Sequence, residues 1–356
     1  MPININDTRL LLAALGQSYP PSTLLRDTFF PNIQTFPTKT VMMDYRKGNR
    51  MMAPFVTKGV SGVNVERGRF TTKEYEPPMM APQRPTTVAD IENRAFGENV
   101  FSSRTPEQRA MELRARDMAE LQDMNTRRIE WMCAQLMLFG QFEAAGYADD
   151  GKTQIIDTIT YSDWTQKLTL TGSDCWLATD GKTPQGDPYS VLEEMSQTIS
   201  RNSGRIPEVA IFSYKTKNAL INNPSLQKIL MIPSRDNMTL MSIQPRITVP
   251  GVVRVGIIES LNLELYAYDG IYQDDNGTIQ QYIPDGYVIM GVPGRGSQLF
   301  GAITQLENDE EFRTYEGAYV PKVWSEKGKD VRMIRVASKC VPKPEFIDDW
   351  YTLKAF

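Results

Sequence analysis

Residues 105–140 read TPEQRAMELRARDMAELQDMNTRRIEWMCAQLMLFG. Thr105 is suited to the N-cap position and Pro106 to the first helical position, and Gln108 completes a capping box. No further proline or glycine occurs before Gly140, which is suited to end a helix in a left-handed conformation. The stretch therefore predicts one helix of 34 residues, roughly 51 Å long at 1.5 Å per residue.

The apolar residues of this helix form a stripe, because they recur at steps of three and four. Asn125 is the one polar interruption, and the segment from 104 to 130 holds six arginines and six acidic residues. The heptad register is imperfect, so the pattern favours a long helix beneath a sheet over a coiled coil. The stripe residues that we expect to face the sheet are Met111, Ala115, Met118, Leu121, Ile129, Met132, Leu136 and Phe139.

The N-terminal 36 residues are predicted to form an arm. A short apolar helix candidate runs from Thr8 to Leu15. Three prolines lie between 20 and 31, around the pair Phe29 and Phe30, and they disfavour both a helix and a central strand there. We expect the two phenylalanines to pack on a surface elsewhere, either on the same subunit or on a neighbour.

The next segment, 37–85, is predicted to be a long hairpin with an extended connector. Apolar and polar residues alternate from Thr40 to Arg46, turn signals follow, and a second strand-like stretch runs from Val63 to Tyr75. Between 39 and 75 there are eight Lys and Arg against three Asp and Glu. A hairpin this polar has little core of its own, so we expect it to lie against another surface. The prolines from 77 to 85 predict a stiff connector.

Beyond residue 150 the chain mixes short strands and helices without an internal repeat, which predicts the α+β class. Helices are expected at 187–200 and 215–221, and a hairpin turn at 274–277. The predicted strands are 155–161, 167–170, 209–212, 252–258, 263–268, 287–292 and 331–341.

The sequence contains no histidine, which excludes Ser–His and Cys–His nucleophile pairs and His-ligated metal sites. The net charge of −4 differs from the strong basic excess of a protein built to grip nucleic acid. Cys133, Cys175 and Cys340 form no CxxC pair and are interpreted as reduced thiols. The chain shows no signal peptide at its start and no apolar run near 18 residues. We expect no enzyme, no cofactor, no metal and no membrane span.

One motif suggests nucleotide chemistry. Residues 146–153 fit the phosphate-loop pattern of Gly, four residues, Gly, Lys and Thr. A true phosphate loop follows a strand and opens a helix, whereas here a helix precedes the motif and a strand-like run follows. Asp149 and Asp150 would also repel phosphates. Ser225 and Lys228 match an acyl-enzyme pattern without the Lys-Thr-Gly that should follow. A nucleotide-binding enzyme that uses 146–153 is the minor alternative.

The order and spacing of several runs resemble the major capsid protein of lambda-type tailed bacteriophages. The N-terminal 140 residues carry the most specific part of this resemblance, which extends weakly to the C-terminal strands. The runs are Leu24–Pro31, Asp44–Lys47 with Gly48 and Arg50, Met52–Val56, Glu66–Arg67, and Arg127–Gln135 with Gly140. The resemblance implies the Hong Kong 97-like capsid fold of the α+β class.

The resemblance also implies a domain organisation. Residues 1–36 become an N-terminal arm, and 37–85 an extended loop that overlaps a neighbouring subunit. Residues 86–185 become a peripheral domain that includes a spine helix at 105–140. The axial domain, 186–295, meets its copies at capsomer centres, and 296–356 return to the peripheral domain.

The implied function is that of a major capsid protein. Pentamers and hexamers would form an icosahedral head around double-stranded DNA, assembled in the host cytoplasm and found in the virion. The implied partners are the chain itself, a scaffolding protein, a portal and a decoration protein, with DNA held by proximity only. A tail, neck or bacterial compartment subunit is the alternative. The expected intersubunit contacts are Phe29, Phe30, Arg46, Lys47, Arg50, Phe55, Glu66 and Arg67.

Overall fold

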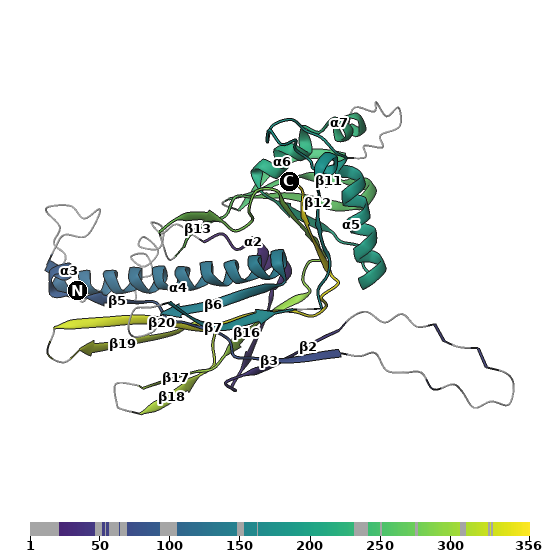
Figure 1. The fold of residues 1–356 in the computed structure, drawn as a ribbon. Helices are drawn as coiled ribbons and strands as arrows, with labels where there is room; N and C mark the ends of the chain where they lie inside the picture. The colour runs from purple at the N-terminus through teal and green to yellow at the C-terminus, as the bar shows by residue number, and fades with distance from the viewer. Residues whose placement is uncertain are drawn as a thin grey trace.

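The fold consists of a long helix on one sheet, joined at its carboxyl end to a second sheet with its own helices (Figure 1). The computed structural model describes residues 21–46, 52–53, 55–56, 64, 70–92, 105–147, 153–161, 163–230, 241–249, 251–274, 277–306, 311–326, 328 and 330–356. The predicted helix at 8–15 lies outside these residues.

The long helix, α4 (Pro106–Phe139), has the predicted ends. The Thr105 side chain accepts a hydrogen bond from the Gln108 backbone N–H, and the Gln108 side chain accepts one from the Thr105 N–H. Gly140 ends the helix with a φ of 70°. A Cβ at this glycine would come within 2.5 Å of the Trp164 ring, so the position requires glycine for two separate reasons.

The predicted stripe on α4 is partly confirmed. Leu121, Ile129, Met132 and Leu136 are buried, whereas Met118 and Phe139 are substantially exposed, so the prediction was wrong for these two. The carboxyl half of the helix is surrounded on more than one side, which a single stripe does not anticipate. Further residues of that half are therefore buried, namely Asn125, Thr126, Glu130, Cys133, Ala134, Met137 and Leu138. In the amino half, Asp117 is buried beneath Arg84.

The sheet beneath α4 is organised around one long strand, β20 (Val331–Pro344). Along its amino-terminal half β20 pairs with β19 (Val320–Glu326) on one side, and its carboxyl-terminal half pairs with β16 (Gly296–Gly301). β1 (Asn32–Phe36) adds to β16 in parallel. In Figure 1, α4 runs along one face of this sheet, and the Asn125 side chain donates to the Val336 backbone oxygen at 2.8 Å.

The proline-rich connector contains two short strands at the edge of this sheet. β4 (Met79–Met80) and β5 (Gln83–Thr86) both pair with β20. Proline is tolerated there because an edge strand has backbone positions that need no partner. Arg84 of β5 donates to the carboxylates of Asp117 and Glu120 at 2.6 Å each, which fastens the connector to α4.

The second sheet has seven strands in the described residues, in the order β10-β11-β12-β9-β15-β21-β8. Helices α5 (Pro188–Ser203), α6 (Tyr214–Ile221) and α7 (Pro224–Leu230) pack beside it. The strands are β8 (Lys167–Thr169), β9 (Val209–Phe212), β10 (Met241–Val249), β11 (Val252–Ile258), β12 (Leu263–Tyr268), β15 (Tyr287–Gly291) and β21 (Trp350–Lys354).

Two of these strands differ from the expected division of the chain. β8 precedes residue 186 and β21 follows residue 296, yet both extend the sheet formed by 209–291. The segment predicted as the axial domain, 186–295, therefore shares its sheet with strands from both flanking segments. Backbone hydrogen bonds of β8 and β21, and not only the chain connections, therefore link the two halves of the molecule.

Residues 24–29 correct the expectation for the arm. They form a helix, α2 (Leu24–Phe29), although the density of prolines argued against one. The prolines lie at 20, 21 and 31, so they flank the helix rather than interrupt it.

Four two-stranded pairs complete the part of the fold that the structure describes. The turn predicted at 274–277 is confirmed by the second of them. The pairs are β2 (Val41–Arg46) with β3 (Phe70–Tyr75), β13 (Ile271–Gln273) with β14 (Ile279–Gln281), β6 (Gln141–Tyr147) with β7 (Thr153–Thr160), and β17 (Ile303–Leu306) with β18 (Phe312–Tyr315). A short helix, α3 (Val88–Glu92), lies beside the start of α4.

Candidate assembly surfaces and the junction that holds them

The phosphate-loop motif lies in a hairpin. Gly146 and Tyr147 end β6, Thr153 begins β7, and Tyr147 is paired with Thr153 in the antiparallel register. In the described residues the motif is followed by β7 and not by a helix, so no helical N–H groups face a phosphate there. Within the described residues no cluster of acidic or cysteine side chains could hold a metal ion, and no helix could cross a membrane.

A buried carboxylate, Glu130 of α4, lies where the arm, the long helix and the second sheet meet. Its side chain is fully buried and accepts hydrogen bonds from the backbone N–H groups of Leu25 and Arg26, at 2.8 and 2.9 Å. The hydroxyl of Tyr268 in β12 donates a third, at 2.9 Å. Burial raises the pKa of Glu130 to about 7, although these donors favour the charged form.

Aromatic side chains enclose this carboxylate. Tyr268 and Tyr282 are stacked with their ring planes 2° apart, and the Tyr282 hydroxyl donates to the Arg127 backbone oxygen at 3.3 Å. The junction therefore joins α4 to the second sheet by polar contacts inside an apolar cluster. The sequence gives one signal for it, an acidic residue within the otherwise apolar run Ile129–Cys133.

Phe29 and Phe30 belong to the same buried cluster. They are 4% and 2% exposed, and a Cβ at Gly296 would come within 2.2 Å of the Phe30 ring. Their surface is already covered by their own subunit, so they are not available as intersubunit contacts. Of the two alternatives for the arm, the structure supports packing on the same subunit.

A second junction lies where two strands pass between the sheets. Arg295 contacts Glu345 and Asp349, at 3.4 Å each, across the β15–β16 and β20–β21 connections. The Trp350 indole N–H donates to the Met137 backbone oxygen at 3.2 Å. These ion pairs and the Trp350 hydrogen bond connect both strand passages and α4, so the junction is suited to fix the angle between the sheets.

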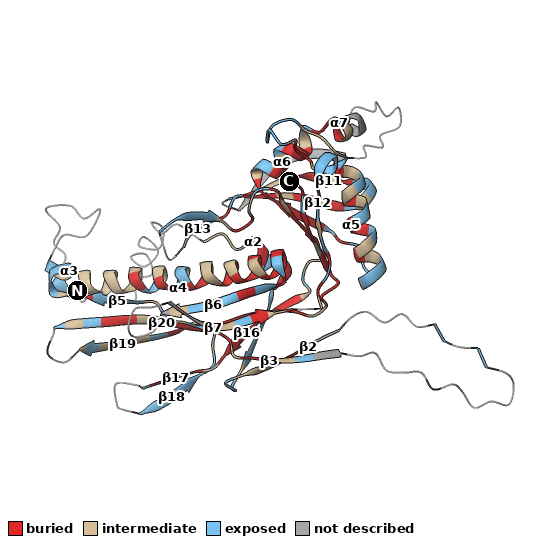
Figure 2. Ribbon diagram, in the orientation of Figure 1, coloured by how far each residue is buried: buried red, intermediate tan, exposed pale blue. Residues whose placement is uncertain are grey.

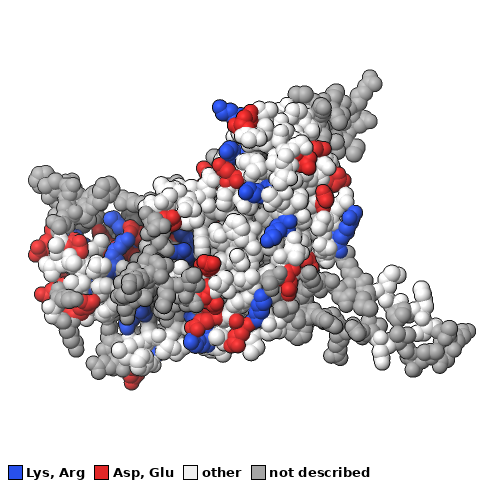
Figure 3. All heavy atoms as spheres, in the orientation of Figure 1, with Lys and Arg blue, Asp and Glu red and all other residues white. Residues whose placement is uncertain are grey.

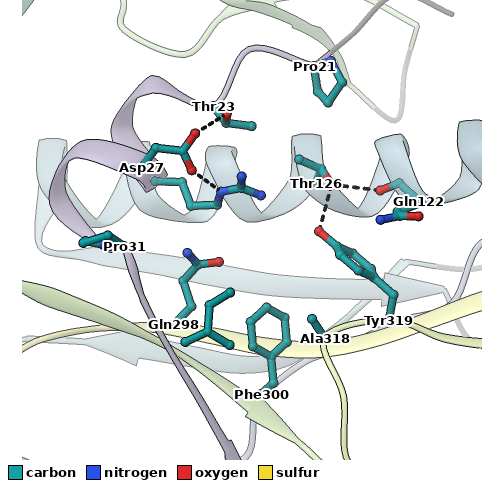
Figure 4. Close-up of a pocket in the computed structure, with 12 residues that line it drawn as sticks. Pro21, Thr23, Asp27, Pro31, Gln122, Thr126, Gln298, Phe300, Ala318 and Tyr319 are labelled. Atoms are coloured by element: carbon teal, nitrogen blue, oxygen red, sulfur yellow. Dashed lines mark hydrogen bonds and ion pairs between the residues drawn. The ribbon is translucent and has the colours of Figure 1, made fainter. Parts of the chain in front are cut away.

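A cavity of about 420 Å³ opens between α2, α4 and the first sheet (Figure 4). Its polar side chains are engaged with one another, since Arg26 contacts Asp27 at 2.9 Å and the Thr126 and Tyr319 hydroxyls lie 2.8 Å apart. Within the described residues, these polar groups of the cavity wall are therefore paired with one another.

The β2–β3 hairpin shows how the extended segment is attached. Met43 is buried and Met42 is exposed, which confirms the predicted alternation. The Tyr75 hydroxyl and the Lys73 ammonium group both donate to the Thr160 backbone oxygen, at 2.6 and 3.0 Å. The base of the hairpin is thus hydrogen-bonded to its own subunit, while the two strands project away from the first sheet (Figure 1).

The predicted contact residues of this segment fall into two groups. Phe55 is fully exposed and Met52 is 88% exposed. The described positions of the segment between β2 and β3 are exposed, which Figure 2 shows in pale blue. The backbone of Arg46 ends β2. The remaining candidates lie outside the described residues, namely Lys47, Arg50, Glu66 and Arg67.

Solved structures share this arrangement over nearly their whole length. The putative capsid protein of a prophage of E. coli CFT073 has a TM-score of 0.65 and 21% identity, and each chain is covered completely. The capsid protein of a native GTA particle has a TM-score of 0.50 and 10% identity, with 95% and 92% of the chains covered. The SrpI encapsulin of Synechococcus elongatus PCC 7942 has a TM-score of 0.46 and 10% identity, with 97% and 94% covered.

The fold is thus the Hong Kong 97-like capsid fold. The chain belongs to the phage major capsid protein E family, whose model matches residues 7–355. It is a structural protein of the phage capsid that assembles with itself into a shell. No curated protein matches the chain in sequence.

Proposed function

We propose that the chain forms pentamers and hexamers that close into an icosahedral head around double-stranded phage DNA. The observation that carries this proposal is the β2–β3 hairpin. Its base is fixed by Met43 and Tyr75, while Phe55 and Met52 present apolar surface to solvent. An exposed apolar surface on a projecting, basic segment is costly in a lone subunit and is typical of an interaction site. A neighbouring subunit in a capsomer would cover it.

The charge distribution supports an inner surface of the head that lies next to the DNA without binding it tightly. Basic and acidic side chains are interspersed on the described residues of the face shown in Figure 3, and the net charge is −4. A strongly basic lining would retain the packaged DNA, because each neutralised phosphate adds affinity. A scaffolding protein, a portal and a decoration protein are proposed as partners, with assembly in the host cytoplasm.

The domain roles in this proposal follow the fold. Residues 37–85 act as the extended intersubunit loop, and the long helix with the first sheet acts as the peripheral domain. The sheet of 209–291, completed by β8 and β21, acts as the axial domain at capsomer centres. The chemistry required of each part is packing and ion pairing, in line with a structural role.

The test is assembly of the full chain, followed by sedimentation and negative-stain microscopy. Wild type should give closed shells of uniform diameter. The triple variant Arg46→Glu, Lys47→Glu and Arg50→Glu should remain folded by circular dichroism but fail to close shells. The charge-conserving control, Arg46→Lys, Lys47→Arg and Arg50→Lys, should assemble. A wild-type chain that sediments as a stable folded monomer, or forms tubes, would contradict the proposed head.

A further inference from the structure

The first sheet has a second face, which points away from α4. Residues alternate between the two faces of a strand, and Ile334 and Val336 of β20 pack with Leu121 of α4. Arg335, which lies between them in the chain, therefore points to the second face. The β17–β18 hairpin lies on the same side of the sheet (Figure 1), and its Gln305 side-chain oxygen accepts a hydrogen bond from Arg335 at 3.3 Å.

Trp324 of β19 lies on this second face beside two cations. The Arg335 guanidinium carbon is 5.9 Å from the centroid of the Trp324 ring, and the Lys322 ammonium nitrogen is 5.3 Å from it. Lys322 and Arg335 are also direct partners in the antiparallel pairing of β19 with β20. All three residues are partly exposed. The face thus presents a tryptophan with two positive charges on neighbouring strands.

Within the described residues these two cations have no counter-charge. Neither forms an ion pair there, whereas Arg84, Arg254 and Arg295 each contact a carboxylate, at 2.6, 2.7 and 3.4 Å. The Arg335 guanidinium donates to the neutral amide oxygen of Gln305, and its Nε is buried without a hydrogen-bond partner among the described residues. Like charges directly opposite each other on paired strands are destabilising, and a cation–π contact offsets only part of this cost. A bound anion would offset the remainder.

The chemistry of the group favours an organic carboxylate as this anion. A guanidinium group matches a carboxylate in shape, because its N–H groups form parallel hydrogen bonds to the two oxygens. The neighbouring Trp324 ring supplies apolar surface for the carbon chain that carries the carboxylate. Nucleic acid is a poorer match, since its affinity comes from many neutralised phosphates and this group offers two charges.

We propose that Lys322, Trp324 and Arg335 form a binding site for an organic carboxylate. The carboxylate contacts both cations, and its carbon chain covers the Trp324 ring. A side chain of another protein chain in the shell and a free carboxylic acid both supply this chemistry, and the experiments below separate the two sources. The site lies within one subunit, so it does not rest on the proposed function.

The first test is titration of the purified full chain with sodium butyrate, which resembles the side chain of a glutamate. Butyrate replaces NaCl at constant ionic strength. Tryptophan emission should change to saturation, and saturation-transfer NMR should show contact between butyrate and the protein. Trp324→Phe should remove the emission change, and uncharged butyramide should not bind. An emission change that persists in Trp324→Phe, equal binding of butyramide, or tighter binding of inorganic phosphate overturns the assignment.

The second test removes the two charges one at a time. Lys322→Gln and Arg335→Gln should each weaken butyrate binding by about tenfold or more, because each variant loses a charge that contacts the ligand. The matched control is Arg332→Gln, since Arg332 is an exposed arginine of the same strand that alternation places on the α4 side. Butyrate should bind this control as it binds wild type. An equal loss in all three variants would reflect overall charge and overturns the site.

A third variant supplies the missing counter-charge within the chain. Lys322→Glu places a carboxylate opposite Arg335, so it should raise the urea midpoint of unfolding and abolish butyrate binding. A lower midpoint together with retained butyrate binding overturns the proposal.

The source of the carboxylate is read from wild-type shells. Loss of butyrate binding on assembly identifies a side chain of another chain at the site, and retained binding identifies a free acid. Failure of wild type to form shells would contradict the proposed function, whereas the binding tests on the single chain would still decide the site.

Discussion

The Glu130 carboxylate accepts a 2.8 Å hydrogen bond from the backbone N–H of Leu25, a residue 105 positions earlier in the chain. With the neighbouring bond from Arg26, it satisfies two N–H groups in the first turn of α2, which have no partner within the helix itself. A six-residue helix is marginal alone, so its docking depends on this carboxylate and on burial of Leu25 and Phe29. The α2 segment of the arm is therefore fixed to the long helix within the subunit itself.

Removal of this carboxylate should loosen the arm. Glu130→Ala leaves the backbone N–H groups of Leu25 and Arg26 without their acceptor, and each unsatisfied buried group costs about 1–3 kcal/mol. The Tyr268 hydroxyl retains the Ser22 backbone oxygen, at 3.3 Å. We expect lower resistance to urea and faster amide exchange across 24–36 than elsewhere in the chain. Glu143→Ala, at an exposed position of β6, should change neither measurement. Unchanged exchange in the Glu130 variant would contradict this role.

The same residue predicts a pH dependence. The pKa of Glu130 is about 7 in the folded chain, against an ordinary value of 4.5. Because the folded state holds the proton more tightly, this residue's contribution to stability is fully present below pH 4.5. It is lost as the pH rises through 7. Relative to Glu130→Gln, wild type should lose stability over this window, at no more than about 1.4 kcal/mol per pH unit.

Urea denaturation of both chains at half-unit pH steps measures this difference. Asp117 and Asp349 also have pKa values raised by burial, and subtraction of the Glu130→Gln curve removes their shared contribution. Two parallel curves between pH 4.5 and 7 would show that Glu130 does not titrate in this range.

Local signals allowed much of the fold to be predicted from the sequence. The limits of α4 follow from Thr105, Gln108 and Gly140, whose roles depend only on their immediate neighbours in the chain. The alternation of Met42 and Met43 likewise reports the two faces of β2. Such features persist in the fold because the groups that determine them are adjacent in sequence.

The junction could not be predicted in the same way. Glu130 lies two positions after Arg128 and resembles part of a solvated face, yet its partners come from 25–26 and 268. Phe29 and Phe30 are a visible aromatic pair, but the sequence does not say which surface covers them. Phe55, by contrast, is fully exposed in the subunit, and its role as an intersubunit contact stays a prediction.

Truncation of Leu121, in the middle of α4, should weaken the packing of this helix on the first sheet. Leu121 is 2% exposed and packs with Ile334 and Val336 of β20. Leu121→Ala should destabilise the subunit by about 2–5 kcal/mol, because it removes apolar contacts and leaves a cavity. Met118→Ala, one turn away and 37% exposed, should cost far less. If Leu121→Ala and Met118→Ala lowered the free energy of unfolding equally in urea denaturation, the helix would pack through a different face.

The end of the long helix gives a prediction that separates backbone strain from steric overlap. Gly140 has a φ of 70° and Gly172 a φ of 64°, so alanine is strained at both positions. Of these two positions, only Gly140 has another group in the way of an added Cβ, the Trp164 ring at 2.5 Å. Nothing lies within 4 Å of a Cβ added at Gly172. Gly172→Ala should therefore cost about 1–2 kcal/mol, the ordinary penalty of the left-handed conformation.

Gly140→Ala should cost more than Gly172→Ala, because Trp164 is stacked on Trp350 and has little room to move. Thermal unfolding followed by tryptophan fluorescence measures both effects, since a displaced Trp164 ring alters the emission of the folded state. The double variant Gly140→Ala with Trp164→Leu should recover part of the difference between the two glycine variants. Equal costs at Gly140 and Gly172, with unchanged emission, would mean that the ring does not limit the residue at the helix end.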